Sequence, residues 1–142
     1  MTIKLQIITP EKIVYQNDVD QITAPTKDGE ITIMPEHVGL LTQVVPGEIT
    51  VKKGENTQAL AVTGGFMEVA KNSVSILADY AIRAEDIEVL KAQEAQKKAQ
   101  KLMEEKVSEK DFAMGQSEMI RAITQLRVAT KYKRHARKPS EI

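Results

Sequence analysis

The spacing of apolar residues changes once along this chain, near Ala81, and this change limits what the chain can fold into. Before that point apolar and polar residues alternate, as they do in SVSILA at residues 73–78. After it, apolar residues recur roughly every three and a half positions. Alternation is typical of strands with one buried face, and the longer period is typical of amphipathic helices. We therefore expect an α+β protein with two domains, residues 1–84 and residues 85–142.

Residues 1–80 are predicted to form short antiparallel strands of a sandwich or barrel, because strand-like segments recur about every ten residues. One face of each strand should point inward, and the nearly continuous apolar segment 38–45 should be buried. Turn signals lie between the strands, and at Lys71-Asn72 the asparagine is able to adopt the left-handed conformation. The signals are Asn17-Asp18, Asp28-Gly29, Pro46-Gly47, Gly54-Glu55-Asn56 and Lys71-Asn72.

A glycine pair, Gly64-Gly65, separates the strand-like sequences LAVT and FMEV. Glycine adopts positive φ values without strain, so the pair predicts a bulge or a sharp bend in one long strand. A phosphate-binding loop is the alternative, but no P-loop lysine follows and no helix begins there. FMEV and SVSILA, joined by the Lys71-Asn72 turn, should form a hairpin.

The second domain is predicted to form an antiparallel hairpin of two helices. The first begins at Ala84, with acidic residues in its first turn, and continues to Glu105. Ser108, three residues before Asp111, is the expected N-cap of the second, whose first turns should fray at Gly115. Each helix carries one stripe of small and apolar side chains. The stripes are Ala92, Ala95, Ala99, Leu102 and Met103 on the first helix, and Phe112, Met119, Ala122, Ile123, Leu126, Ala129 and Thr130 on the second.

This helical hairpin is expected to be weakly held, because a seam of Ala methyl groups buries less apolar area than a Leu-rich one. Isolated helices of this length are marginal in water, so folded, extended and partner-bound states should exchange. The second helix also carries a basic face, and residues 119–140 contain no acidic residue. Such a face suits an acidic partner surface, while a solvated helix face is the plain alternative. The residues of this basic face are Arg121, Arg127, Lys131, Arg134 and Lys138.

Composition disfavours several kinds of chemistry. The chain has no Cys and two His, so thiolate metal sites, cysteine nucleophiles and a Ser/His/Asp triad are not expected. His37 is expected to be a solvated residue at a strand end, and His135 a member of the basic run. The first residues show no basic segment followed by an apolar run, and no window approaches about 18 apolar residues, so we expect neither a signal peptide nor a membrane-spanning helix. We expect no catalytic residue, no metal site and no direct membrane insertion.

A second interpretation makes the sandwich an adaptor whose basic helical arm binds nucleic acid or an anionic membrane surface. Tyr132 is the single aromatic residue that could stack on bases within the basic run, and the net charge of the chain is zero. Both observations disfavour this interpretation. A third interpretation, an enzyme of other chemistry, is disfavoured by the missing catalytic residues.

Several segments together resemble the epsilon subunit family of bacterial and chloroplast F-type ATP synthases. They occur in the order of that family and extend from about Ile22 to Ala129. The segments are DGEITIMPEHVGLLT, the Pro46-Gly47 turn followed by EITV, LAVTGGFMEV, NSVSILAD followed by AIRAEDI, and AITQLRVA.

The resemblance implies an antiparallel β-sandwich of about ten strands followed by a helical hairpin. It also implies a non-catalytic central-stalk subunit that couples c-ring rotation to the catalytic head at the cytoplasmic face of the bacterial plasma membrane. By this resemblance, the sandwich binds the gamma subunit and the c-ring, with Glu30 and His37 facing the c-ring. The extended helical arm would contact the beta and alpha subunits and inhibit ATP hydrolysis. No nucleic acid is expected as a partner.

Some members of this family bind ATP through the pattern Ile-Asp-x-x-Arg-Ala. The matching residues here are Ile87, Glu88, Lys91 and Ala92, so both charges are kept while both charged residues differ. Lys lacks the bidentate fork with which Arg holds a phosphate. The match therefore predicts at most a regulatory ATP site, and no other cofactor is expected.

Overall fold

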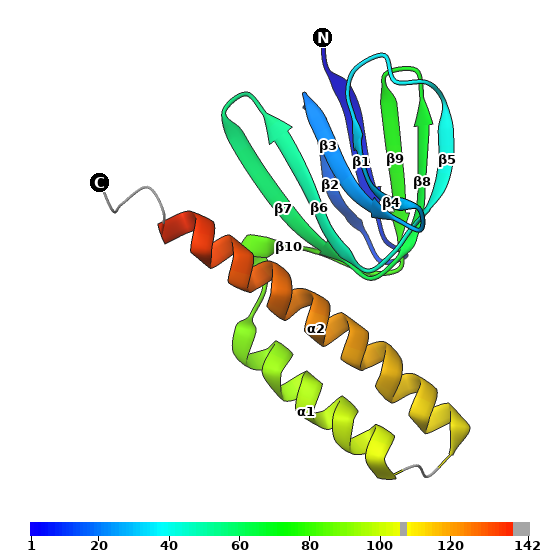
Figure 1. Ribbon diagram of the computed structural model, residues 1–142, viewed down its shortest axis with the longest axis vertical. Helices are drawn as coiled ribbons and strands as arrows, with labels where there is room; N and C mark the ends of the chain where they lie inside the picture. Colours follow the sequence, from blue (N-terminus) through cyan, green and yellow to red (C-terminus); the bar gives the residue numbers. More distant parts are fainter. Residues whose placement is uncertain (106–107, 138–142) are drawn as a thin grey trace. The chain divides into compact units, whose positions relative to one another are not determined.

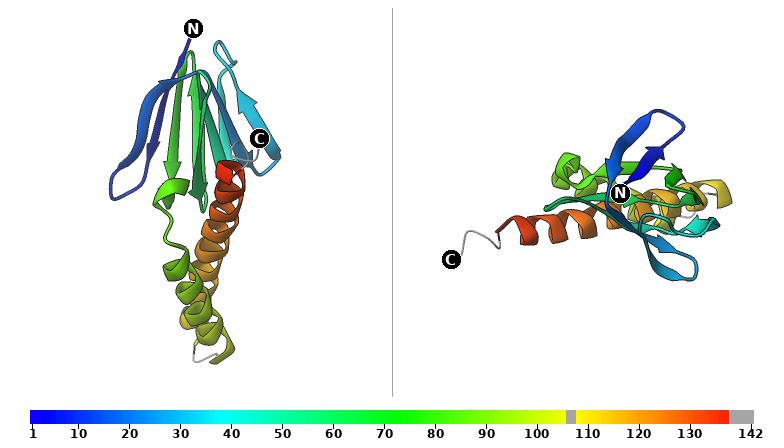
Figure 2. Two further views of the ribbon diagram at one scale, coloured as in Figure 1. Left: turned by 90° about the vertical axis from the view of Figure 1, so that its left-hand side faces the viewer. Right: turned by 90° about the horizontal axis from the view of Figure 1, so that it is seen from above.

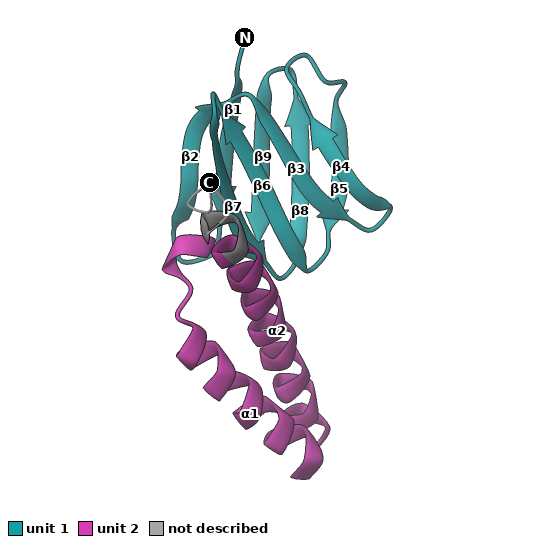
Figure 3. Ribbon diagram, turned by 60° about the vertical axis from the view of Figure 1, so that its left-hand side comes forward, with its two compact units in different colours: residues 1–83 teal, residues 84–142 magenta. Residues whose placement is uncertain are grey.

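The computed structural model describes residues 1–105 and 108–137 and divides the chain into two compact units, Met1–Arg83 and Ala84–Ile142 (Figure 3). The first unit is built from strands, and the described part of the second is built from helices. The predicted α+β class, a β-sandwich followed by a helical hairpin, is therefore confirmed.

Ten strands form the first unit, all of whose residues the structure describes (Figure 1). Four of them alternate buried side chains with more exposed ones, as the period-two pattern predicts. Their bounds are β1 (Ile3–Ile8), β2 (Ile13–Val19), β3 (Gln21–Thr26), β4 (Gly29–Ile33), β5 (Leu40–Val44), β6 (Gly47–Lys53), β7 (Asn56–Val62), β8 (Gly65–Ala70), β9 (Ser73–Ala78) and β10 (Ala81–Arg83).

The strands follow the order β10-β7-β6-β3-β5-β8-β9-β1-β2, and β4 pairs with β3. Strand β3 pairs with β6 through its first residues and with β5 through the single pair Thr26↔Val44. The sheet folds at this junction into two layers around one core, whose residues lie between Ile3 and Ala81. Every member of that core belongs to the first unit.

A side chain joins the two ends of this strand order. Arg83, on β10, donates from Nε and Nη2 to the Val14 carbonyl oxygen on β2, at 3.4 and 3.3 Å. Its guanidinium carbon lies 5.4 Å from the centroid of the Tyr15 ring. Arg83 thereby covers part of an edge strand that would otherwise present a bare carbonyl group.

One strand pair departs from the predicted antiparallel arrangement. Strands β1 and β9 are parallel, with Leu5 opposite Val74 and Ile7 opposite Ile76. Turn signals determine the orientation of strands that are consecutive in the chain, such as β8 and β9. They say nothing about strands about 70 residues apart, so the orientation of β1 against β9 could not be predicted from them.

The turn predicted at Asn17-Asp18 is wrong, because β2 continues through both residues to Val19. Both residues are paired with β1, Asn17 with Leu5 and Asp18 with Lys4. The Asn17 Oδ1 atom accepts hydrogen bonds from the Asp18 N–H and from Lys53 Nζ, each at 2.9 Å. Pairing with β1 has overridden the local turn preference of this dipeptide.

The sharp bend predicted at Gly64-Gly65 is confirmed, but the flanking segments are two strands. Strand β7 pairs with β6 and β10, whereas β8 pairs with β5 and β9, so the glycines carry the chain between the layers. Their φ values are +136° and +141°, and a Cβ atom on Gly65 would collide with the Leu77 carbonyl oxygen. The hairpin of β8 and β9 is also confirmed, but the positive φ of its turn belongs to Lys71 (+56°) and not to Asn72.

The apolar segment 38–45 is less buried than predicted. Val44 is buried, whereas Leu41 is 68% exposed and Val38 is 77% exposed. Strand β5 lies in one layer of the sandwich, so one of its faces points away from the core. An apolar run of this length does not distinguish a strand buried on both faces from one that presents apolar residues outward.

In the second unit, Ala84–Asp86 form a 3₁₀ turn, followed by α1 (Val89–Glu105) and α2 (Glu109–Arg137). The first helix therefore begins at Val89 and not at Ala84 as predicted. Helices α1 and α2 lie side by side as an antiparallel hairpin (Figures 1 and 2). The predicted cap of α2 is confirmed, since the Asp111 N–H donates to Ser108 Oγ at 3.1 Å.

Small residues form the seam of this hairpin, as predicted. Ala92 and Ala99 of α1 and Ala122 and Ala129 of α2 are buried. Thr124 and Val128 are also buried although they lie off the predicted stripe, whereas Phe112 and Thr130 are exposed although they lie on it. Thr124 is accommodated because its Oγ1 donates to the Ile120 carbonyl oxygen at 2.7 Å.

Gly115 is a buried contact point of the hairpin, and its surroundings differ from the predicted fraying turn. A Cβ atom at this position would lie 2.7 Å from Met103 Cγ and 3.1 Å from the Ala99 carbonyl oxygen. The missing side chain therefore lets α2 approach α1 closely. The cost in helix propensity that glycine imposes is accompanied by a packing role that the sequence pattern did not indicate.

Candidate partner-binding surfaces

Four apolar side chains form a band across the outer face of β2, β1, β9 and β8. Register places Ile13 opposite Ile8, Ile8 opposite Leu77, and Leu77 opposite Phe66. Ile13, Leu77 and Phe66 are 52%, 57% and 56% exposed, and Ile8 is half-buried. We call Ile8, Ile13, Phe66 and Leu77 the apolar band. A contiguous exposed apolar surface of this kind marks a site of interaction with another macromolecule.

Sequence reasoning missed the apolar band, although a signal for it was present. In FMEV the inward positions are Met67 and Val69, and in SVSILA they are Val74 and Ile76. Phe66 and Leu77 are therefore apolar residues at outward positions of two consecutive strands. Alternation alone predicts polar residues there, so each exception indicates a second buried face or a partner.

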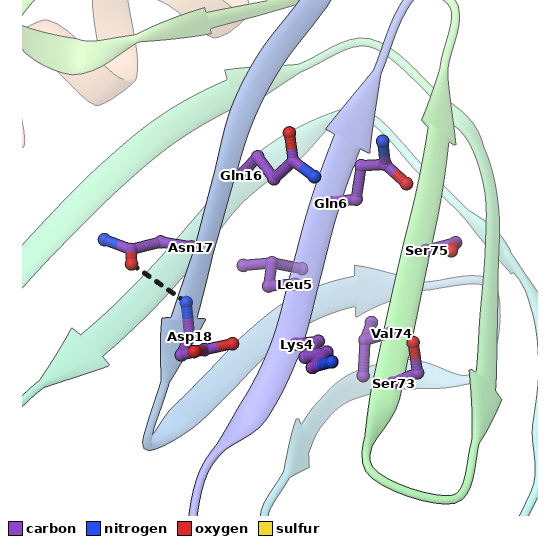
Figure 4. Close-up of a pocket in the computed structure, with 9 residues that line it drawn as sticks. All are labelled: Lys4, Leu5, Gln6, Gln16, Asn17, Asp18, Ser73, Val74 and Ser75. Atoms are coloured by element: carbon purple, nitrogen blue, oxygen red, sulfur yellow. Dashed lines mark hydrogen bonds between the residues drawn. The ribbon is translucent and has the colours of Figure 1, made fainter.

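A polar hollow lies on the same outer face (Figure 4). It adjoins the apolar band, because the pair Gln6 and Ser75 lies two residues before the pair Ile8 and Leu77. It is lined by side chains of β1, β2 and β9, among them Lys4, Gln6, Asp18 and Ser75. These side chains alternate with the core residues Leu5 and Val74. The outer face of this layer therefore changes from polar to apolar along its strands.

The segment 34–39, between β4 and β5, forms an exposed loop. Met34 is 56% exposed and Val38 is 77% exposed. The His37 N–H donates to the Met34 carbonyl oxygen at 3.2 Å, and His37 Nδ1 lies 2.7 Å from the Val38 carbonyl oxygen. Glu36 has a φ of +65°, which is uncommon for a residue other than glycine.

The two residues expected to face the c-ring lie at opposite ends of β4. Glu30 is exposed near the start of this strand, and half-buried His37 follows its end. The structure therefore does not bring the two side chains together. The role expected for each residue stays a prediction.

The residues that match the ATP pattern lie at the start of α1. Ala92 is buried, and its N–H donates to the Glu88 carbonyl oxygen at 3.0 Å. Lys91 Nζ pairs with Glu88 Oε2 at 3.0 Å, and the two side chains are 77% and 64% exposed. Lys91 is thus the one cation of this pattern that could hold a phosphate, and it is already paired with a carboxylate. ATP binding stays a prediction.

The basic face is described only in part. Arg127 and Lys131 are exposed on α2, one helical turn apart, and Arg121 is half-buried. Arg134 belongs to α2, but its side chain lies outside the described residues, as does the whole of Lys138. The described side chains agree with a cationic face on this helix.

Residues 1–105 and 108–137 contain no group of three or more His, Asp or Glu side chains placed to hold a metal ion. In the same part of the chain, neither helix is both long and apolar enough to cross a bilayer.

The fold and these surfaces define a class of protein, a β-sandwich followed by a helical hairpin. The exposed apolar band on the sandwich suits a subunit of a larger assembly. A family model for the ATP synthase delta/epsilon chain matches residues 2–84 as its beta-sandwich domain, and a second matches residues 85–130 as its long alpha-helix domain. The chain therefore belongs to the ATP synthase delta/epsilon family, and the resemblance predicted from its motifs is confirmed.

Similar proteins agree with this assignment. The chain is 40% identical to an ATP synthase epsilon chain of Herpetosiphon aurantiacus over 129 residues, which covers 91% of this chain and 95% of the relative. It is 33% identical to the epsilon chain of Thioalkalivibrio sulfidiphilus over 139 residues, covering 96% and 99%. A chain of the Euglena gracilis mitochondrial ATP synthase shares its fold, with a TM-score of 0.75 at 23% identity over 91% of this chain and 81% of that chain.

Proposed function

We propose that the chain is a non-catalytic central-stalk subunit of a proton-translocating ATP synthase, held peripherally at the cytoplasmic face of the membrane. In this proposal, the sandwich binds the gamma subunit and the c-ring and couples rotation of the ring to the catalytic head. The helical arm contacts the beta and alpha subunits and inhibits ATP hydrolysis. The apolar band is the observation that carries the proposal.

The apolar band supports a stable protein contact because the sandwich does not need it for its own core. The core is completed by the inward side chains of the same strands, among them Leu5, Met67 and Ile76. Three members of the band remain more than half exposed, and covering them would contribute about 25 cal/mol for each Å² removed from water. We assign the gamma subunit to this band, since a rotor must be joined to the sandwich by a contact that survives rotation.

The helical arm supports the regulatory part of the proposal. Its seam is made largely of Ala and Gly, so the hairpin gains less from burial than a Leu-rich pair of helices would. Arg127 and Lys131 are exposed on α2 and could contact acidic loops of catalytic subunits. A weakly held hairpin with a cationic helix is suited to change between a folded and an extended form.

Substitution of the apolar band tests the proposal. Phe66→Ser with Leu77→Ser removes most of the exposed apolar surface without touching the core, so the variant should fold while binding the gamma subunit about tenfold more weakly or worse. Gln6→Ala with Ser75→Ala, on the same outer face, is the matched control and should bind normally. Affinity is measured by titrating each full-length variant into ATP synthase depleted of this subunit. Normal binding by the Phe66/Leu77 variant would show that the band is not the gamma-binding surface.

A further inference from the structure

One side chain in the turn between β8 and β9 connects this turn to the loop that carries His37. Asn72 Oδ1 accepts a hydrogen bond from the Glu36 N–H at 2.8 Å, across 36 residues of sequence. The main-chain oxygen of the same residue accepts from the Lys4 N–H, also at 2.8 Å. Asn72 therefore joins the β8–β9 turn, the loop 34–39 and the start of β1.

The turn itself does not require asparagine at this position. Asparagine is common in tight turns because it tolerates positive φ values. In this turn the positive φ belongs to Lys71, so that property is not used at Asn72. What the structure uses at position 72 is the side-chain oxygen, which reaches the loop.

The loop needs such a support because its backbone is strained. Glu36 has a φ of +65°, a conformation that a residue with a Cβ atom adopts at a cost. In this conformation the Glu36 N–H points toward Asn72, and the hydrogen bond to Asn72 Oδ1 stabilises it. Met34 and Val38, on either side, keep apolar side chains in solvent, so the loop has little burial of its own to fix it.

We propose that Asn72 is a positioning residue that holds Met34, His37 and Val38 in the arrangement that docks onto the c-ring. This inference rests on the proposed function, in which the sandwich binds the c-ring, and it adds that the loop 34–39 lies at that contact. In the absence of the Asn72 acceptor, the backbone at Glu36 would relax toward negative φ. The side chains of Met34 and Val38 would then move away from His37. The loop would still be present, but it would dock with an additional ordering cost.

Two substitutions at position 72 separate the acceptor from the rest of the residue. Asn72→Ala removes the acceptor, whereas Asn72→Asp keeps an oxygen in the same place. In the full chain, hydrogen exchange at the Glu36 amide should be roughly three- to tenfold faster in Asn72→Ala and close to wild type in Asn72→Asp, the range expected for one hydrogen bond. Binding to ATP synthase depleted of this subunit should weaken by a similar factor in Asn72→Ala and recover in Asn72→Asp.

A loop variant, Met34→Ser with Val38→Ser, distinguishes the two ways in which the inference can fail. Unchanged exchange at Glu36 in Asn72→Ala would overturn the positioning role directly. If exchange is faster but Asn72→Ala binds normally, while the loop variant binds weakly, the loop docks without help from Asn72 and the positioning role is again overturned. If the loop variant also binds normally, the loop does not face the ring, and the failure lies in the proposed contact on which the inference rests.

Discussion

Gly65 and Gly54 both have positive φ values, but their surroundings differ. A Cβ atom on Gly65 would collide with the Leu77 carbonyl oxygen, whereas nothing lies within 4 Å of a Cβ atom built on Gly54. The two positions therefore compare a positive φ in open space with a positive φ beside a steric clash. Gly65 lies where the chain passes between the two layers, so a shift there would disturb the pairing of β8 with β9.

We predict that Gly65→Ala lowers the free energy of unfolding by about 3 kcal/mol, the sum of the positive-φ cost and an overpacking cost. Gly54→Ala, with a φ of +60° and open space, should lower it by about 1 kcal/mol. Urea denaturation followed by tyrosine fluorescence measures both, since Tyr15 is buried in the sandwich core. Equal losses in the two variants would show that the close approach at Gly65 is relieved by movement of β9.

Single residues show which features of the fold could be predicted from local sequence preferences and which could not. The glycine pair predicted a bend because its missing side chains are a local property. The identity of Lys71 as the positive-φ residue and the reach of Asn72 to Glu36 depend on which segments the fold brings together. Local preference assigned the unusual conformation to asparagine, and the geometry of the β8–β9 turn gave it to the neighbouring lysine.

Among the elements, the helical hairpin shows the strongest conflict between local preference and packing. Gly115 is unfavourable within α2 by about 1 kcal/mol relative to Ala, whether α2 is paired or alone. Only in the hairpin would a side chain at this position meet another helix, because there the position faces Met103 and Ala99. The residue therefore favours the paired form over an extended single helix.

We predict that Gly115→Ala shifts the hairpin toward the extended form. The new Cβ atom would clash with α1 in the hairpin and would strengthen α2 when the helix is alone. The chain has no Cys, so spin labels on cysteines placed at Gln100 and Gln116 would report the separation of the helices without interference. The distribution should gain a long-distance population in Gly115→Ala.

Ala113→Gly provides the opposite change on an exposed position of the same helix. It weakens α2 without entering the seam, so it should not separate the helices by a clash. A distance distribution in Gly115→Ala that matched the wild type would contradict the role of this glycine in pairing.

The basic face gives a second prediction for the helical arm. Replacing Arg127, Lys131 and Arg134 by Ala should raise ATP hydrolysis by the assembled complex about threefold or more, because the arm loses attraction for acidic partner loops. Replacing Lys97, Lys98 and Lys101 on α1 makes the same change in net charge and should leave hydrolysis nearly unchanged. Equal effects of the two sets would mean that net charge matters and that the α2 face does not.

The elements themselves were predictable to different degrees. Hairpins with short turns and the two helices followed from local period and capping residues. The prediction ended β2 before Asn17-Asp18, whereas the strand continues to Val19. Its last residues are held by pairing with β1, which local sequence preferences do not reveal. The outward apolar residues of β5, β8 and β9 could not be assigned to a face until the order of the strands was known.

At the scale of the whole molecule, the core residues explain why one change in apolar period was enough to predict the two parts of the fold. The sandwich core lies between Ile3 and Ala81, and the buried residues of the hairpin lie between Ala84 and Ala129. Each set is contiguous in sequence, so each leaves its own periodic signal. The candidate partner-binding surfaces leave a weaker signal, because they combine residues from strands distant in the chain, such as Ile13 and Phe66.

A chain that ends after Ile87 tests this separation of cores. The truncated chain keeps every residue of the sandwich core and the Arg83 contact to Val14, so it should fold and still assemble with ATP synthase depleted of this subunit. It lacks α1 and α2, so hydrolysis should lose its restraint while ATP synthesis continues. Circular dichroism melting of the truncated chain, together with synthesis and hydrolysis rates of the reconstituted complex, measures all three outcomes.

A truncated chain that does not fold, or a full chain with one unfolding transition that truncation abolishes, would mean that the sandwich depends on the helices for its stability. The proposed mobile arm would then be excluded, because an element required for folding could not leave the sandwich during regulation.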